Sequence, residues 1–174
     1  MYSVKGIALL DSDGNRILAK YYDCEDSFST VKEQKAFEKK LFSKTHKANA
    51  EIILLDGLIC VYRSNVDLFF YVMGGGQENE LILVNVLNAL YDSVSQILRK
   101  QVEKKTLLDH LDVVMLALDE ICDQGVVLET EPSAIVGRAM LRAEDVAFAE
   151  QSVGNIGKQL FQSAKEQVRW SLLK

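Results

Sequence analysis

The alternation of apolar and polar residues predicts neighbouring antiparallel strands in the first half of the chain. Three apolar runs follow one another with short polar breaks: Ile52–Leu55, Leu58–Tyr62 and Val66–Met73. The first break is Asp56-Gly57, and Asp-Gly between apolar runs is a strong hairpin signal because both central residues of such a turn favour positive φ. The second break is Ser64-Asn65, so three adjacent strands are expected here.

The chain before these strands predicts another hairpin and a helix. The hairpin consists of two apolar runs and a turn: Tyr2–Leu10, Arg16–Tyr22 and, between them, Asp11–Asn15. The helix is expected to begin at Ser27 or Ser29 and to reach about Lys44, because serine side chains accept hydrogen bonds from the free amides of a first helical turn. Four residues are expected to supply its apolar contacts: Val31, Phe37, Leu41 and Phe42.

A long helix is predicted from Asn79, its cap, to Lys100, after a flexible turn at Gly74-Gly75-Gly76. One face repeats Leu83, Leu87, Leu90, Val94 and Ile97, and further apolar residues surround the first three turns. A helix that is apolar nearly all round is buried on more than one side, so a second helical layer or another protein must cover it. We therefore predict a partner interface from these residues: Leu81, Val84, Leu87, Leu90, Tyr91 and Val94.

The second half of the chain predicts three shorter helices. The first has an apolar face formed by Leu107, Leu108, Leu111, Val114, Met115, Leu118, Ile121 and Cys122, and it ends near Gly125. An extended Val126–Leu128 and a short helix at Ser133–Arg142 follow. We predict a domain over residues 1–142, a linker over 143–149 and an amphipathic helical tail over 150–174. The order of strands and helices predicts an α+β fold rather than a doubly wound sheet.

Composition places the protein among globular proteins of the cytoplasm. Its hydrophobic content is 48% and no apolar run reaches the roughly 18 residues of a membrane-spanning helix. The N-terminus lacks the features of a signal peptide, and the scattered cysteines Cys24, Cys60 and Cys122 predict free thiols. The net charge of −5 argues against nucleic acid as a partner.

One segment departs from this acidic balance. Six lysines and two glutamates lie between Lys32 and Lys47, and the lysines form a basic patch: Lys32, Lys35, Lys39, Lys40, Lys44 and Lys47. The simple interpretation is a solvated helix face. The other is a surface that meets an acidic partner or an anionic membrane.

The sequence predicts no catalytic residue, metal site or cofactor. It has no nucleophile elbow, no phosphate-binding loop and no Cys-x-x-Cys pair. Asp109 and Asp112 flank His110 in sequence but do not share its helical face. The glycines before the long helix are followed by Glu78 and Glu80, which would repel a phosphate. A non-enzymatic subunit is the expected class.

Several stretches together resemble the zeta-subunit family of coatomer, the COPI vesicle coat, which is similar to the small sigma chains of clathrin adaptors. They are Ala19-Lys20-Tyr21-Tyr22, Ala36-Phe37-Glu38-Lys39 with Lys44-Thr45, Glu78-Asn79-Glu80-Leu81, Asp119-Glu120-Ile121, and an ending over residues 162–167 and 170–173. The resemblance covers nearly the whole chain, and the C-terminal segment distinguishes zeta from sigma chains.

The resemblance implies a longin-like fold, with a five-stranded antiparallel sheet and helices on its faces. It implies a role in retrograde transport from Golgi to endoplasmic reticulum and within the Golgi. It further implies the gamma subunit of coatomer as partner, assembly in the whole coatomer complex, indirect recruitment by an Arf-family GTPase, and peripheral association with Golgi membranes and COPI vesicles.

The likeness to sigma chains implies an alternative function, the reading of acidic-dileucine sorting motifs. Sigma chains bind such peptides in a pocket along their long helix. The matching positions in this chain are Val84, Ser93 and Val94, with Ser93 in place of the asparagine of that family's pocket.

Overall fold

The structure is a computed structural model that describes residues 4–22, 28–47 and 51–144. The chain divides into two units, residues 1–139 and 140–174, and the first unit contains the sheet and the helices packed on it. Its elements are β1 (Val4–Asp11), β2 (Arg16–Tyr21), α1 (Val31–Thr45), β3 (Ile52–Leu55), β4 (Leu58–Asn65), β5 (Leu68–Gly75), α2 (Glu80–Ile97), α3 (Lys104–Asp109), α4 (Leu111–Ile121), β6 (Cys122–Asp123) and β7 (Val126–Val127). Residues 132–144 are also helical, and the predicted linker beyond 144 and the tail lie outside the described residues.

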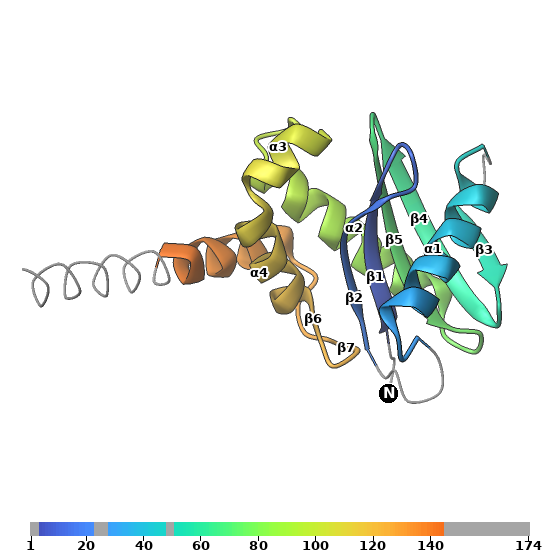
Figure 1. Cartoon of the computed structure of the whole chain (residues 1–174). Coiled ribbons are helices and arrows are strands. Elements are labelled where there is room, and N and C mark those ends of the chain that lie inside the picture. Colours follow the sequence, from blue (N-terminus) through green and yellow to red (C-terminus); the bar gives the residue numbers. More distant parts are fainter. Residues whose placement is uncertain (1–3, 23–27, 48–50, 145–174) are drawn as a thin grey trace, which may run out of the picture. The chain divides into compact units, whose positions relative to one another are not determined.

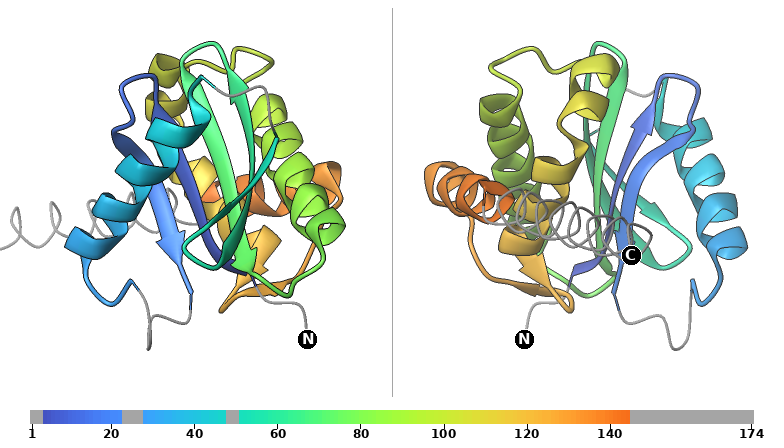
Figure 2. Two further views of the ribbon diagram at one scale, coloured as in Figure 1. Left: turned by 90° about the vertical axis from the view of Figure 1, so that its right-hand side faces the viewer. Right: turned by 60° about the vertical axis from the view of Figure 1, so that its left-hand side comes forward.

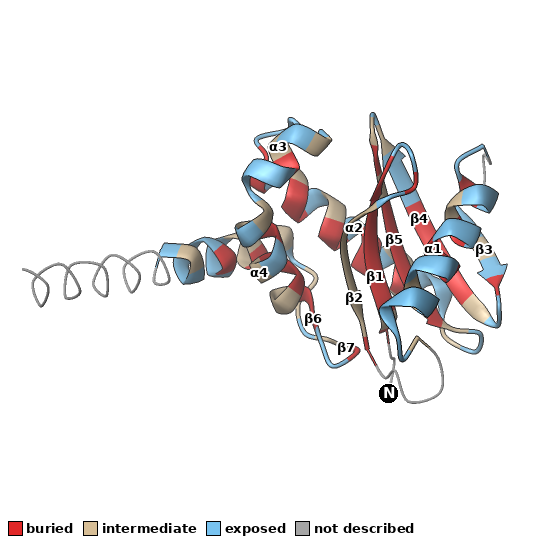
Figure 3. Ribbon diagram, viewed as in Figure 1, coloured by how far each residue is buried: buried red, intermediate tan, exposed pale blue. Residues whose placement is uncertain are grey.

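The five long strands form one antiparallel sheet in the order β2-β1-β5-β4-β3 (Figure 1). The α+β fold with a five-stranded antiparallel sheet is therefore confirmed. The central strands β1 and β5 are buried on both faces, because nearly every residue of each strand is buried (Figure 3). Helix α1 covers one face, and α2 covers the other (Figure 2).

The two faces of the sheet have separate hydrophobic cores. On the α1 face, Leu10, Tyr71 and Met73 pack with Phe37 and Leu41 of α1. On the α2 face, alternate residues of the same strands pack with α2, α4 and the helical residues Ile135 and Ala139. Because side chains alternate across a strand, a single apolar run such as β5 supplies both cores.

Thr30 is the cap of α1, so the predicted cap at Ser29 is wrong. The other predicted cap, Ser27, lies outside the described residues. The Thr30 hydroxyl accepts from the Glu33 amide and the Glu33 carboxylate accepts from the Thr30 amide, both at 3.2 Å. This reciprocal capping box fixes the helix start. Val31 is the first helical residue and is 58% exposed, so its predicted core contact is wrong.

The β4–β5 hairpin turns at Val66-Asp67, not at the predicted Ser64-Asn65. Val66 has a φ of 51°, which a β-branched residue rarely adopts, and 81% of its surface is exposed. Contacts outside the hairpin hold the turn, because Asn65 donates to the Tyr91 hydroxyl at 2.9 Å and Asp67 accepts from the Lys104 amide at 3.0 Å. These partners come from distant segments, so local turn preferences do not reveal the register.

Helix α2 has the predicted cap, because the Asn79 side chain accepts from the Leu81 amide at 2.9 Å. The helix ends at Ile97 rather than at the predicted Lys100. Arg99 and Lys100 both take positive φ, which is not a helical conformation. The helix predicted through residues 107–122 is two helices, α3 and α4, which meet at His110 in a non-helical conformation. Gly125 follows as expected in the left-handed region, within the β6–β7 hairpin.

The predicted flexible turn at Gly74-Gly75-Gly76 is wrong, because Gly74 and Gly75 are residues of β5. A Cβ atom on Gly74 would lie 2.7 Å from Cδ1 and 2.8 Å from Cδ2 of Leu83. A Cβ atom on Gly76 would lie 2.7 Å from the Gly57 carbonyl oxygen. These glycines let a helix and a neighbouring turn approach the sheet closely.

The β1–β2 turn is confirmed where it was predicted, and Asp11 organises it. The Asp11 carboxylate accepts from the amides of Asp13 at 3.0 Å and Asn15 at 2.8 Å, and from Lys104 Nζ at 2.8 Å. Burial alone would raise the pKa of Asp11, but the Lys104 ammonium and these amides together hold that pKa below its ordinary value.

We predict that Gly74→Ala lowers the free energy of unfolding by about 1–3 kcal/mol, because the added methyl group overpacks the contact with buried Leu83. Gly137→Ala is the control, since its Cβ would meet nothing within 4 Å and helical alanine is favoured over glycine. Urea unfolding measures both. An unfolding free energy of Gly74→Ala equal to that of wild type would show that the contact between Gly74 and Leu83 of α2 is not tight.

We predict that Asp11→Asn lowers the free energy of unfolding at pH 7 by about 1–3 kcal/mol, through loss of charge-assisted hydrogen bonds. The pKa of Asp11 is lower in the folded state, so the wild type loses this stabilisation as pH falls below about 4 through the folded value. The difference in unfolding free energy between wild type and Asp11→Asn should therefore disappear in acid. Urea unfolding at several pH values would measure it. Exposed Asp13→Asn is the control, and parallel pH curves for wild type and Asp11→Asn would contradict this account.

Candidate interaction surfaces

The residues of the predicted interface on α2 do not share one environment. Leu87, Leu90 and Val94 are buried in the core between the sheet and α4. Val84 and Tyr91 are half-buried and pack against that core. Leu81 is 75% exposed. Helix α4 is thus the second layer that the apolar pattern required, and Leu81 is the residue of this set whose side chain is open to a partner.

Tyr91 anchors a polar cluster where α2 crosses the end of β4. The Arg63 guanidinium lies 3.7 Å from the centroid of the Tyr91 ring, and the Tyr91 hydroxyl accepts from Asn65. Phe70 meets the same ring edge-on, with 5.4 Å between centroids. A cation over an aromatic face contributes about 0.5–1 kcal/mol at an exposed site. No motif in the sequence reveals this cluster, because Arg63 and Tyr91 belong to different elements.

The positions of the implied sorting-motif pocket are largely closed. Ser93 and Val94 are fully buried, and Val84 is half-buried. Among the described residues, the Ser93 hydroxyl oxygen is buried without a hydrogen-bond partner. A peptide leucine could reach Ser93 or Val94 only if α2 moved away from its neighbours, so the pocket stays a prediction that depends on such a movement.

Further large apolar side chains are exposed after α2, among them Leu108 at 49%, Met115 at 50% and Leu128 at 58%. Leu108 and Met115 were predicted on the buried face of one continuous helix. Leu107 of α3 and Val114 of α4 enter the core instead, so Leu108 and Met115, each the next residue along, face outward. Leu108 and Met115 therefore add apolar surface that the sequence pattern assigned to the core.

All six lysines of the predicted basic patch are exposed, and Lys47 lies just beyond the end of α1. Of the two glutamates of the segment, Glu38 is 2% exposed and adds no charge to the outward face, whereas Glu33 is exposed and takes part in the capping box. The patch is therefore more strongly cationic than the count of charges along the sequence indicates.

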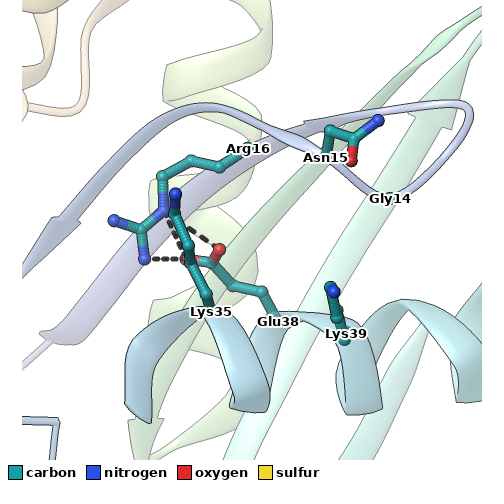
Figure 4. A pocket seen from close by; sticks show the side chains of 6 residues that line it. All are labelled: Gly14, Asn15, Arg16, Lys35, Glu38 and Lys39. Atoms are coloured by element: carbon teal, nitrogen blue, oxygen red, sulfur yellow. Dashed lines mark hydrogen bonds and ion pairs between the residues drawn. The ribbon is translucent and has the colours of Figure 1, made fainter. Parts of the chain in front are cut away.

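Glu38 is neutralised beneath α1 by Arg16 of β2 (Figure 4). The guanidinium Nε lies 2.9 and 3.0 Å from the two carboxylate oxygens, and Nη2 lies 2.6 Å from Oε1. The Tyr21 hydroxyl also donates to Glu38 at 2.9 Å. Burial, and then the negative charge of Glu38, raise the pKa of Tyr21 well above its ordinary value, so the phenol stays protonated as a donor.

Two hollows lie along α1 next to this ion pair. The first is about 250 Å³ and is lined by Gly14, Asn15, Arg16, Lys35, Glu38 and Lys39. Lys35 and Lys39 rise from α1 on either side of Glu38 (Figure 4). The second is about 510 Å³ and is lined by Val31, Lys32, Lys35, Ala36 and Lys39. Lys35 and Lys39 line both hollows.

No group of three metal-ligating side chains occurs among the described residues. In the same part of the chain, no helix is both long enough and apolar enough to cross a bilayer. The described surfaces with distinct chemistry are the exposed apolar residues of α2, α3 and α4 and the lysines along α1.

Comparison with known proteins gives a consistent result. Residues 3–146 match the family model described as the clathrin adaptor complex small chain. The chain is 55% identical to coatomer subunit zeta-1 of Bos taurus and of Homo sapiens over 174 residues, all of this chain and 95% of each relative. It is 44% identical to coatomer subunit zeta-1 of Arabidopsis thaliana over 98% of this chain and 97% of that protein.

A structural comparison supports the fold. A chain in a homology model of the full-length AP-3 complex in a stretched open conformation superposes with a TM-score of 0.67. The match covers 86% of this chain and 98% of that one, at 15% sequence identity. At that identity the likeness shows a shared fold, and function must be argued from the closer relatives and the surfaces.

We predict that the two single substitutions of the buried ion pair differ in cost. Arg16→Gln leaves the carboxylate of Glu38 buried without its cation and should cost about 3–5 kcal/mol of unfolding free energy. Glu38→Gln leaves a guanidinium that is 18% exposed and should cost about 1–3 kcal/mol. The double variant should cost less than the sum, as urea unfolding would measure.

The exposed Lys40–Asp56 pair is the matched control for this cycle. Lys40→Gln should change the unfolding free energy by less than about 1 kcal/mol, because exposed ion pairs contribute little. Equal and small effects of Arg16→Gln and Glu38→Gln would show that Glu38 is not held by Arg16 in solution.

Proposed function

This chain belongs to the clathrin adaptor complex small chain family, among the zeta subunits of coatomer, and from that membership we propose that it is a non-enzymatic small subunit of the COPI vesicle coat. The observation that carries the proposal is the length of the similarity. The family model ends at residue 146, whereas the likeness to zeta subunits continues over all 174 residues. The segment that follows the shared domain is thus common to this chain and the zeta subunits.

The proposed partner is the gamma subunit of coatomer, which would hold this chain within the whole complex. The exposed apolar residues of α2, α3 and α4 support a docking surface on that side of the sheet: Leu81, Leu108 and Met115. Permanent interfaces bury more than about 2,000 Å² and are rich in apolar side chains. Val84 and Tyr91 would border this surface, while Leu87, Leu90 and Val94 would support it from the core.

The proposed cellular role is retrograde transport from Golgi to endoplasmic reticulum and transport within the Golgi. The chain would reach the membrane from the cytoplasm as part of the coat, which an Arf-family GTPase recruits. The likeness to coatomer subunits supports this role.

We predict that Leu81→Asp weakens binding to the gamma subunit by at least about 30-fold, because an apolar anchor at an interface contributes about 2 kcal/mol or more. The fold should be unaffected, since Leu81 is 75% exposed. Co-expression and co-purification with gamma would measure the pairing, and thermal unfolding would measure the fold.

Val66→Asp is the matched control, because Val66 is equally apolar and 81% exposed at the β4–β5 turn. Leu87→Asp should prevent folding, since it buries a carboxylate in the core. If Leu81→Asp and Val66→Asp bind gamma equally well, Leu81 does not belong to the interface. A wild-type chain that never pairs with gamma would overturn the proposed function.

A further inference from the structure

Helix α1 carries its positive charge along its whole outward side rather than at one point. Lys32, Lys35 and Lys39 follow the helical spacing of one stripe, and Lys44 continues toward the end of the helix. From Lys32 to Lys44 the charge extends about 18 Å, at about 1.5 Å per residue. Among the described residues, no carboxylate forms a salt bridge with these four lysines.

The acids near this side have partners other than the four lysines of the stripe. Glu38 is bound to Arg16 beneath the helix, Glu33 closes the capping box, and Asp56 pairs with Lys40. The remaining cations therefore face outward on a chain whose net charge is −5. A local excess of charge opposite to that of the whole molecule favours an anionic surface and orients the protein toward it.

The position of α1 makes the stripe accessible to a flat surface. Of the described helices, α1 alone contributes to the core on its face of the sheet, and it lies across the outside of that face (Figures 1 and 2). Its outward residues are exposed along the length of the helix (Figure 3). A ridge of this kind meets a plane along its length.

The hollow beside the stripe fits the chemistry of a lipid headgroup. It is about 510 Å³, and its lining combines Val31 and Ala36 with the three lysines of the stripe. The lysines can bind phosphate and carboxylate oxygens, while Val31, at 58% exposure, offers apolar surface to the glycerol and upper acyl region. This combination favours a bilayer over a purely polar polyanion.

We propose that the outward face of α1 is a contact surface for the anionic cytoplasmic leaflet of a membrane, with phosphate-bearing headgroups between Lys32, Lys35 and Lys39. The choice of a membrane over an acidic protein rests on the proposed coat function, which places the chain beside a bilayer. Each lysine near an anionic surface strengthens partitioning by about fivefold, so three give about two orders of magnitude. Contacts of this strength orient a subunit within a multivalent coat.

The test is flotation of the full-length chain with vesicles of 70% phosphatidylcholine and 30% phosphatidylserine, and with pure phosphatidylcholine vesicles. The wild type should bind only the anionic vesicles, and binding should fall with added salt because the contact is electrostatic. The triple variant Lys32→Gln, Lys35→Gln, Lys39→Gln should partition on the order of 100-fold more weakly. Thermal unfolding checks that it remains folded.

The matched control is Arg99→Gln, Lys100→Gln, Lys105→Gln, which removes the same charge from exposed positions after α2. Its partitioning should stay within a few-fold of wild type. Equal loss in both triple variants, or no binding of the wild type to anionic vesicles, would overturn the proposal. A third result would assign α1 to a protein partner instead: the wild type does not bind vesicles, and an acidic protein that binds the wild type fails to bind the Lys32 triple variant.

The same variants separate this inference from the proposed function. The Lys32 triple variant should still co-purify with the gamma subunit, since the stripe lies on the α1 face of the sheet. Gamma pairing without vesicle binding would overturn the membrane contact alone. Vesicle binding without gamma pairing would overturn the coat assignment and leave the membrane contact standing.

Discussion

Burial of the central strands on both faces is the constraint on which the rest of the structure depends. Strands β1 and β5 lie in the middle of the sheet and expose almost none of their side chains. Each face therefore needs a helical cover, and the two covers must use their apolar sides for the sheet. What remains on the outer sides of α1, α2 and α4 is the surface available for function.

The two covers leave surfaces of different chemistry. Helix α2 is itself covered by α4, and the layer on its side still exposes Leu81, Leu108 and Met115. Helix α1 has no second layer among the described residues, and it turns lysines outward while Arg16 neutralises Glu38 beneath it. One side thus exposes apolar residues and the other exposes cations, and these are the surfaces proposed for a protein partner and for an anionic membrane.

Close approach between layers depends on a few residues whose role is steric or polar rather than apolar. Gly74 allows Leu83 of α2 to press against β5. Asp11 ties the β1–β2 turn to Lys104, and Asn65 and Tyr91 tie the β4–β5 end to α2. These contacts hold turns in place that local preferences alone would not select, such as the positive φ of Val66. Low identity to the AP-3 chain is compatible with the shared fold because the apolar pattern can persist while such details change.

Local patterns in the sequence were enough to specify the α+β class, the order of the main strands and helices, and the cap at Asn79, because periodicity and capping are local properties. They also located the basic segment on one helix. The folded structure was needed to assign Leu87, Leu90 and Val94 to the core and Leu81 to the surface, because the way α4 packs over one side of α2 is a tertiary contact that the periodicity of α2 does not encode. Glu38 is a second example. The sequence shows a negative charge among the lysines of α1, but only the structure shows that Arg16 of β2 binds Glu38 beneath the helix, away from its outward face.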